Sequence, residues 1–149
     1  MSRFTFPLTS LLSYRRHRRE LCRQLLAEVL ADDARLRAEQ DELAHEHGEV
    51  LNELRRLGEG GALDVDRAAT RRYYAALVRR RIDASQGRRQ LVANQLHLCR
   101  QALVKADGEV RMLERLEETR RAEHRSREER RTAHELEDLW NARQQMQAR

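Results

Sequence analysis

The sequence has few of the residues that interrupt helices or fill a broad core. Its 149 residues include one proline, Pro7, six glycines, one tryptophan, three tyrosines and two phenylalanines. Leucine, isoleucine, valine and phenylalanine together contribute only 32 residues. So little apolar volume excludes a thick globular core, but it is enough for a narrow interface between helices.

The sequence also lacks the usual signals for membrane insertion and secretion. No apolar run approaches the length of about 18 residues that a transmembrane helix needs. The start, MSRFTFPLTSLLSYRRHRR, places its apolar residues before its basic ones, the reverse of a secretory signal peptide. The two cysteines, Cys22 and Cys99, lack CxxC spacing. These features favour a cytoplasmic protein that carries free thiols and is not inserted in a membrane.

Helix-forming and charged residues dominate what is present. Alanine, glutamate, lysine, leucine and arginine make up 87 of the 149 residues, a proportion typical of coiled coils and long helices. The formal net charge is +5, with 29 arginines and one lysine, and the basic surplus lies in residues 58–113. This moderate surplus can attract an acidic partner, but it is weaker than the basic stripe of a nucleic-acid-binding protein.

A seven-residue repeat runs through the first third of the chain. It predicts a helix over residues 8–57 that packs as a coiled coil against a partner helix. The repeat positions are Leu8, Arg15, Cys22, Val29, Leu36, Leu43, Val50 and Leu57, and Leu11, Leu12, Leu25, Leu26 and Leu54 occupy neighbouring interface positions.

A glycine cluster in LGEGGALDVD follows and predicts a turn over residues 58–64. Asp64 or Asp66 can cap a second helix over residues 65–142. That helix has apolar residues at alternating intervals of three and four. The predicted fold is therefore all-α, a single domain over residues 1–149 that forms a long antiparallel two-helix coiled-coil hairpin. The expected interface positions of the second helix are Ala75, Val78, Ile82, Ser85, Arg89, Val92, Leu96, Cys99, Leu103, Ala106, Val110 and Leu113.

Folding the hairpin about residue 61 places Leu8 opposite residue 114. The apolar interface positions of the second helix end at Leu116, close to the level along the hairpin at which the first helix begins. We therefore expect a C-terminal helical overhang over residues 117–140 that has no partner within the chain. The same alignment places Cys22 and Cys99 at similar levels.

The arginine run RRHRR at residues 15–19 is also placed by this alignment. Arg15 and Arg18 come opposite Asp107 and Glu109. Ion pairs between the helices are therefore expected here.

Two interpretations of the overhang stay open. It can be a frayed segment of mixed charge, or a helix that docks into another protein. Large apolar residues return near its end at helical spacing, and tryptophan is a frequent interface anchor. The candidate partner-binding residues are Glu135, Leu136, Glu137, Asp138, Leu139 and Trp140, together with the basic triplet Arg79, Arg80 and Arg81.

No motif indicates catalysis or a bound cofactor. His45 and His47 are two residues apart, so they point to different sides of a helix, and there is no HExxH motif. The glycines do not form a phosphate-binding loop, and no serine or cysteine has the setting of a catalytic triad. We therefore expect neither an enzyme, nor a metal site, nor a cofactor.

The segment FTFPLTSLLSYRR, from Phe4 to Arg16, resembles the FxFPLxxLLxxR start of the FliJ family of flagellar export stalk proteins. The resemblance extends over nearly the whole chain. It includes the length, the glycine-containing turn, the Tyr73-Tyr74 pair near the start of the second helix, and the acidic and apolar end at residues 135–139.

This resemblance implies a non-enzymatic part of the flagellar type III protein export apparatus. Family members act as a coiled-coil stalk in the ring of the hexameric export ATPase. They also contact the cytoplasmic domain of the export-gate membrane protein and bind export chaperones. The implied location is the cytoplasm, peripheral to the inner membrane at the flagellar base. The alternatives are the stalk of a virulence injectisome, a generic coiled-coil scaffold that self-associates, and a nucleic-acid-binding coiled coil.

Overall fold

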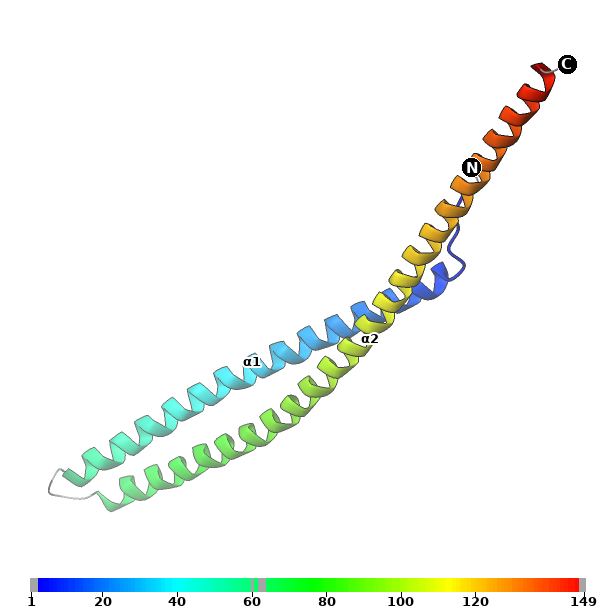
Figure 1. Ribbon diagram of the computed structural model, residues 1–149. Helices are drawn as coiled ribbons and strands as arrows, with labels where there is room; N and C mark the ends of the chain where they lie inside the picture. The colour runs from blue at the N-terminus through cyan, green and yellow to red at the C-terminus, as the bar shows by residue number, and fades with distance from the viewer. Residues whose placement is uncertain (1–2, 60, 62–63, 148–149) are drawn as a thin grey trace. The chain divides into compact units, whose positions relative to one another are not determined.

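The computed structural model describes residues 3–59, 61 and 64–147, with side chains for all of these except 145 and 147. The described residues are 94% helical and contain no strand. Helix α1 spans Thr9–Glu59 and helix α2 spans Val65–Gln147, and the two helices pack against each other (Figure 1). The prediction of an all-α, two-helix hairpin is confirmed.

The helix ends follow local hydrogen bonding. Thr9 opens α1, and its hydroxyl donates a hydrogen bond of 2.6 Å to the carbonyl oxygen of Phe6. The Asp64 carboxylate caps α2, as predicted, by accepting a hydrogen bond of 3.1 Å from the backbone N–H of Arg67. Gly61 adopts a positive φ of 74°, which favours glycine.

Both helices run further than the repeats predicted. Helix α1 continues through Gly58 to Glu59, and α2 continues beyond residue 142 to Gln147. Residues 60, 62 and 63 of the predicted turn lie outside the described residues.

The chain divides into two compact units. One unit combines residues 1–21 with residues 103–149, and the other is the hairpin of residues 22–102. Each unit brings a part of α1 beside a part of α2, and each has its own buried cluster.

The predicted interface stripe of α2 is confirmed throughout. All twelve of its positions are buried or half-buried, and Val78 and Val110 are completely buried. In the hairpin of residues 22–102, Val29 of α1 packs in one cluster with Leu96 and Cys99 of α2.

The prediction for α1 needs correction at three leucines. Leu8, Leu11 and Leu25 are exposed by 37%, 40% and 52%, although they were expected at the interface. Leu12 and Leu26, which directly follow Leu11 and Leu25, pack against α2 instead. Leu8 lies before the start of α1. Consecutive helical residues diverge by about 100°, so a two-helix interface can take only one of each pair.

A polar layer interrupts the core in the hairpin unit, and its acidic member was not predicted. Asp33 is only 7% exposed. Its carboxylate lies 2.7 Å from the Arg37 guanidinium and 3.5 Å from that of Arg89 on α2. Arg89 also donates a hydrogen bond of 3.1 Å to Gln40. Because a buried carboxylate needs charged or hydrogen-bonding partners, this layer constrains the relative positions of the two helices.

Both cysteines are free thiols with different surroundings. Cys99 is buried among Val29 and Leu96, whereas Cys22 is half-buried and is not a member of that cluster. Cys99 therefore serves as a small buried apolar residue of the interface, whereas Cys22 is only partly covered.

In the other unit, the residues before α1 form an extended strap, Arg3–Pro7, that packs on α2. Phe6 is 5% exposed and belongs to a buried cluster with Leu12, Val110 and Leu113. Its neighbour Phe4 packs against this cluster and reaches further along α2.

The strap contradicts the expectation that nothing faces α2 beyond Leu116. The Phe4 ring lies 5.5 Å from the His124 ring, edge to face, and the Arg121 guanidinium lies 5.7 Å from the Phe4 ring centre. The helical partner does end near Leu8, but extended chain continues past it and covers one more part of α2.

The predicted ion pairs between the helices are present in the same unit. Arg15 lies 2.7 Å and Arg18 lies 4.0 Å from the Glu109 carboxylate. Arg19 lies 3.4 Å from Asp107. The RRHRR run therefore serves to join α1 to α2.

We expect Phe6→Ala to lower the free energy of unfolding by about 3 kcal/mol, because it leaves a cavity in the cluster that anchors the strap. Tyr14→Ala is the matched control, since Tyr14 is 59% exposed, and should cost less than about 1 kcal/mol. Urea unfolding followed by circular dichroism measures both. Equal losses would contradict the anchoring role of Phe6.

Ser85→Ala should raise the free energy of unfolding by about 1 kcal/mol. Ser85 is completely buried, and its hydroxyl oxygen has no hydrogen-bond partner among the described residues. Ser126→Ala, at a half-buried position inside α2, corrects for the higher helix propensity of alanine. A net loss of stability after this correction would show that the Ser85 hydroxyl is satisfied in the folded chain.

Candidate partner-binding surface

The last part of α2, which we call the tail, consists of residues 129–147. Every residue from Glu129 to Gln144 is exposed, and Met146 is 82% exposed. The residues on its N-terminal side still touch the strap, as His124 does. The tail is therefore the part of α2 in which every described side chain is exposed.

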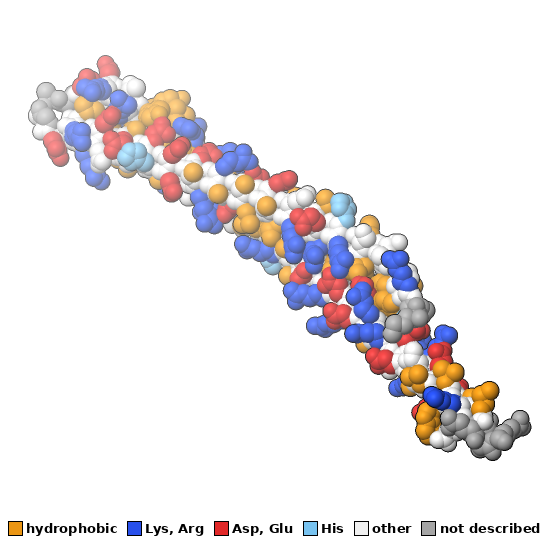
Figure 2. Space-filling view, turned by 90° about the horizontal axis from the view of Figure 1, so that it is seen from above, with side chains coloured by type: hydrophobic (Ala, Val, Ile, Leu, Met, Phe, Trp, Pro, Cys, Tyr) orange, Lys and Arg blue, Asp and Glu red, His pale blue; other side chains and the backbone are white. Residues whose placement is uncertain are grey.

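Three large apolar side chains form one face of the tail. Leu136, Leu139 and Trp140 are 67%, 68% and 63% exposed. Their spacing of three and four residues places them on the same side of the helix. Leu136 and Trp140 line a shallow depression together with Glu137 and Asn141. Hydrophobic side chains gather at this end of α2 in the view of Figure 2.

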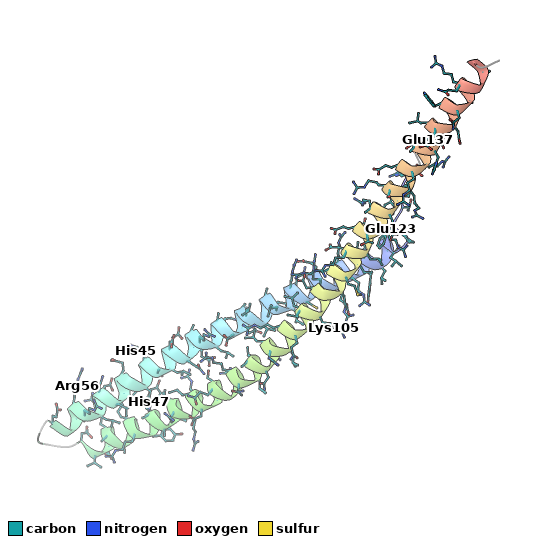
Figure 3. All side chains as sticks on the ribbon, in the orientation of Figure 1. His45, His47, Arg56, Lys105, Glu123 and Glu137 are labelled. Atoms are coloured by element: carbon teal, nitrogen blue, oxygen red, sulfur yellow. The ribbon has the colours of Figure 1, made fainter. Side chains whose placement is uncertain are left out.

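Carboxylates flank the apolar face. Glu135 accepts a hydrogen bond of 2.9 Å from Arg131, which raises the pKa of that guanidinium. The Glu137 carboxylate lies 3.7 Å from Nδ1 of His134 and projects from α2 into solvent (Figure 3). Asp138 is exposed. The predicted tail residues thus form a contiguous surface with an apolar face and acidic edges.

The basic triplet lies in the other compact unit and is partly engaged within it. Arg79 lies 3.4 Å from Asp83 on the same helix, and Arg81 lies 3.4 Å from Glu46 of α1. Arg80 is exposed. Arg79 and Arg81 therefore have roles in holding local structure, and the triplet is a weaker candidate for partner binding than the tail.

Glu46 of α1 contacts two side chains of this part of α2. Besides Arg81, it receives a hydrogen bond from the Tyr74 hydroxyl. That hydrogen bond raises the pKa of the Tyr74 phenol above its usual value. Of the Tyr73-Tyr74 pair, Tyr74 is thus tied to α1, whereas Tyr73 is 69% exposed.

The structure gives the histidines no common site. His45 is exposed and His47 is half-buried on α1 (Figure 3). Within the described residues, no group of three or more histidine, cysteine, aspartate or glutamate side chains is arranged to hold a metal ion.

Sequence reasoning missed two features of the surface. The first is the strap, although Phe4 and Phe6 before Pro7 were a visible signal. The second is a column of exposed apolar residues on α2, including Leu91 and Leu98, which are 64% and 62% exposed. The sequence signal for this column is a seven-residue spacing of apolar residues next to the buried interface positions of α2.

No helix in the described part of the chain combines the length and apolar character that crossing a membrane requires. A scan against protein-family models and searches of curated proteins and of solved structures find no match to this chain.

Two truncations should separate the tail from the part of α2 that the strap covers. A chain ending at Glu128 loses only the exposed tail, so its free energy of unfolding should change by less than about 1 kcal/mol. A chain ending at Leu116 also loses the contacts of Phe4 with Arg121 and His124, and should be less stable by a further 1 to 2 kcal/mol or so. Urea unfolding of both chains provides the comparison. A large loss on removal of the tail alone would show that the tail packs within the chain.

Proposed function

We propose that this chain is a non-enzymatic coiled-coil stalk of the bacterial flagellar type III protein export apparatus. In this role it inserts into the ring of a hexameric export ATPase. It links that ring to the cytoplasmic domain of the export-gate membrane protein and to export chaperones. Its place is the cytoplasmic side of the inner membrane at the flagellar base.

The observation that carries the proposal is the exposed tail. A helix that continues from Glu129 to Gln147 without burying a described side chain gains no stability from packing within its own chain. It nevertheless presents Leu136, Leu139 and Trp140 on one face. Large apolar side chains on one face of an isolated helix are typical of a surface that docks into another protein.

The resemblance of residues 4–16 to export stalk proteins supports the same role. In this chain, Phe4 and Phe6 of that segment pack against α2, and Leu12 is buried in one cluster with Phe6. The segment thereby sets where the covered part of α2 ends and the free tail begins.

The mixed charge of the surface is a second supporting feature. Acidic and basic side chains alternate over the face seen in Figure 2. Examples on α2 are the pairs Glu117–Arg121 and Arg131–Glu135, at 2.9 Å each. Such pairs stabilise an isolated helix by a few tenths of a kcal/mol each.

The decisive experiment measures the ATP hydrolysis rate and the hexamer content of a cognate export ATPase with and without this chain. We expect both to rise. The double variant Leu136→Ser/Trp140→Ser should weaken binding to the ATPase or the export gate at least about tenfold, because burying side chains of this size is worth on the order of 2 kcal/mol each. Val104→Ser is the control, because Val104 is also apolar and 73% exposed but lies outside the tail.

The other functions predict different results. A generic scaffold leaves the ATPase unchanged, and an injectisome stalk activates the injectisome ATPase rather than the flagellar one. A nucleic-acid-binding coiled coil binds DNA or RNA with a strong dependence on salt. An ATPase whose rate and assembly ignore this chain would overturn the proposal.

A further inference from the structure

A second column of apolar residues runs along the outside of α2. Leu77, Ala84, Leu91 and Leu98 follow one another at intervals of seven residues, and all four are exposed. This interval keeps side chains on one face of a helix that joins a coiled coil. The buried stripe already packs against α1, so the column gives α2 a second face suited to packing against a helix.

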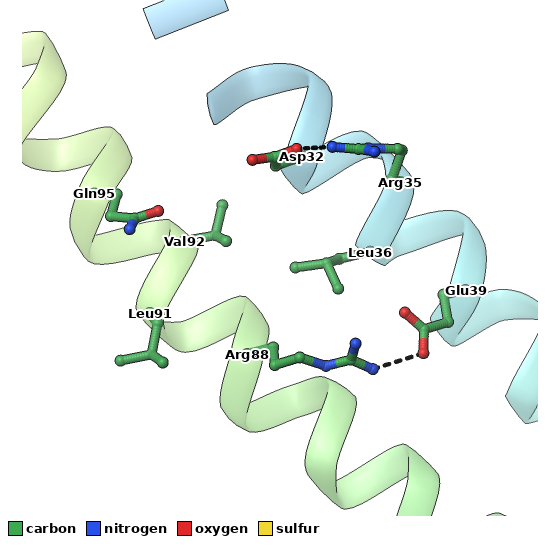
Figure 4. A pocket seen from close by; sticks show the side chains of 8 residues that line it. All are labelled: Asp32, Arg35, Leu36, Glu39, Arg88, Leu91, Val92 and Gln95. Atoms are coloured by element: carbon green, nitrogen blue, oxygen red, sulfur yellow. Dashed lines mark hydrogen bonds and ion pairs between the residues drawn. The ribbon is translucent and has the colours of Figure 1, made fainter. Parts of the chain in front are cut away.

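Helix α1 extends this apolar surface across a groove (Figure 4). Leu36 of α1 and Leu91 and Val92 of α2 line the groove, and Leu36 and Val92 are half-buried there. Leu25 lies seven residues before Asp32, which lines the same groove, so it continues the surface along α1. Leu25 is 52% exposed. Both helices of the hairpin therefore offer apolar side chains on one side.

The charges around the groove balance. Asp32 forms an ion pair with Arg35 on α1, and Arg88 of α2 lies 2.6 Å from Glu39 of α1. Two arginines and two carboxylates leave this surface neutral, although the whole chain carries a net charge of +5. A strongly acidic or strongly basic partner finds no complementary excess of charge here.

We propose that this face binds a second copy of the same chain and that the free protein forms a dimer through residues 22–102. A second copy supplies a helix with the same seven-residue column. In a two-fold arrangement each copy presents the same patch to the other. Because the charged side chains around the groove sum to zero, two basic chains do not repel each other at this surface. Arginines of one copy can then lie beside carboxylates of the other.

This proposal does not depend on the function proposed above. The column and the groove belong to the unit of residues 22–102, whereas the tail belongs to the other unit. Dimer formation is tested by the mass of the free protein, and the stalk function by the response of the ATPase. Either can fail while the other holds.

The test is sedimentation velocity of the full chain over a hundredfold range of concentration. We expect a reversible monomer–dimer equilibrium, with a melting midpoint that rises with protein concentration. Leu91→Glu should weaken dimerisation at least about tenfold, since it places a charge in a surface that becomes apolar and buried. Leu98→Gln should weaken it in the same direction.

Val104→Glu is the matched control. Val104 lies on the same helix, is 73% exposed and is not part of the column. It should leave the dimer unchanged, and circular dichroism should show all three variants to be as helical as the parent chain. A chain that is monomeric at every concentration, or a control that dissociates as readily as Leu91→Glu, would overturn the proposal. Binding of a different helical protein by a monomeric chain would overturn it as well.

Discussion

Two helices can bury one another only along the shorter of the two. Helix α1 has 51 residues and α2 has 83, so α1 cannot cover all of its partner. The extended strap reaches a little further, where Phe4 touches Arg121 and His124. From Glu129 onward no described side chain of α2 is buried. The difference in helix length thus divides α2 into a part paired with α1, a part covered by the strap, and the tail.

The paired part depends on arginine as well as on apolar packing. Arg15 and Arg19 join α1 to carboxylates of α2 in one unit, and Arg89 joins α2 to the buried Asp33 in the other. Exposed ion pairs contribute little stability individually. Their positions nevertheless favour one alignment of α1 along α2. The apolar repeats alone would allow the two helices to shift along each other by seven residues. These arginines are therefore engaged inside the chain.

Most of the fold was accessible from the sequence because seven-residue repeats report directly on helix packing. The stripe from Ala75 to Leu113 was predicted in full. The repeats could not locate the strap, because its two phenylalanines lie in extended chain, which has no helical period. They also could not decide between adjacent leucines such as Leu11 and Leu12. That choice depends on the rotation of α1 against α2, which its partner sets.

The surface residues differ in how far the sequence reveals their role. Trp140 and its neighbours stand out because apolar residues return after a long polar stretch. Arg79 and Arg81 looked equally available. Asp83 lies four residues after Arg79 on the same helix, so that pair could be read from the sequence, whereas the pairing of Arg81 with Glu46 on α1 becomes evident only in three dimensions. The column around Leu91 was hidden because it lies beside a stronger repeat on the same helix. A sequence pattern detects apolar periodicity, but it does not separate a face that is already packed from one that is free.

Backbone hydrogen exchange along α2 tests the central claim most directly, because it reports on each part of the helix in one experiment. In the free chain we expect strong protection from Ala75 to Leu113, weaker protection as far as Glu128, and little beyond Glu129. On addition of the export ATPase or the cytoplasmic domain of the export gate, protection should appear around Leu136 and Trp140. A tail as protected in the free chain as the paired region, or a tail unchanged by either partner, would contradict the assignment of this surface to partner binding.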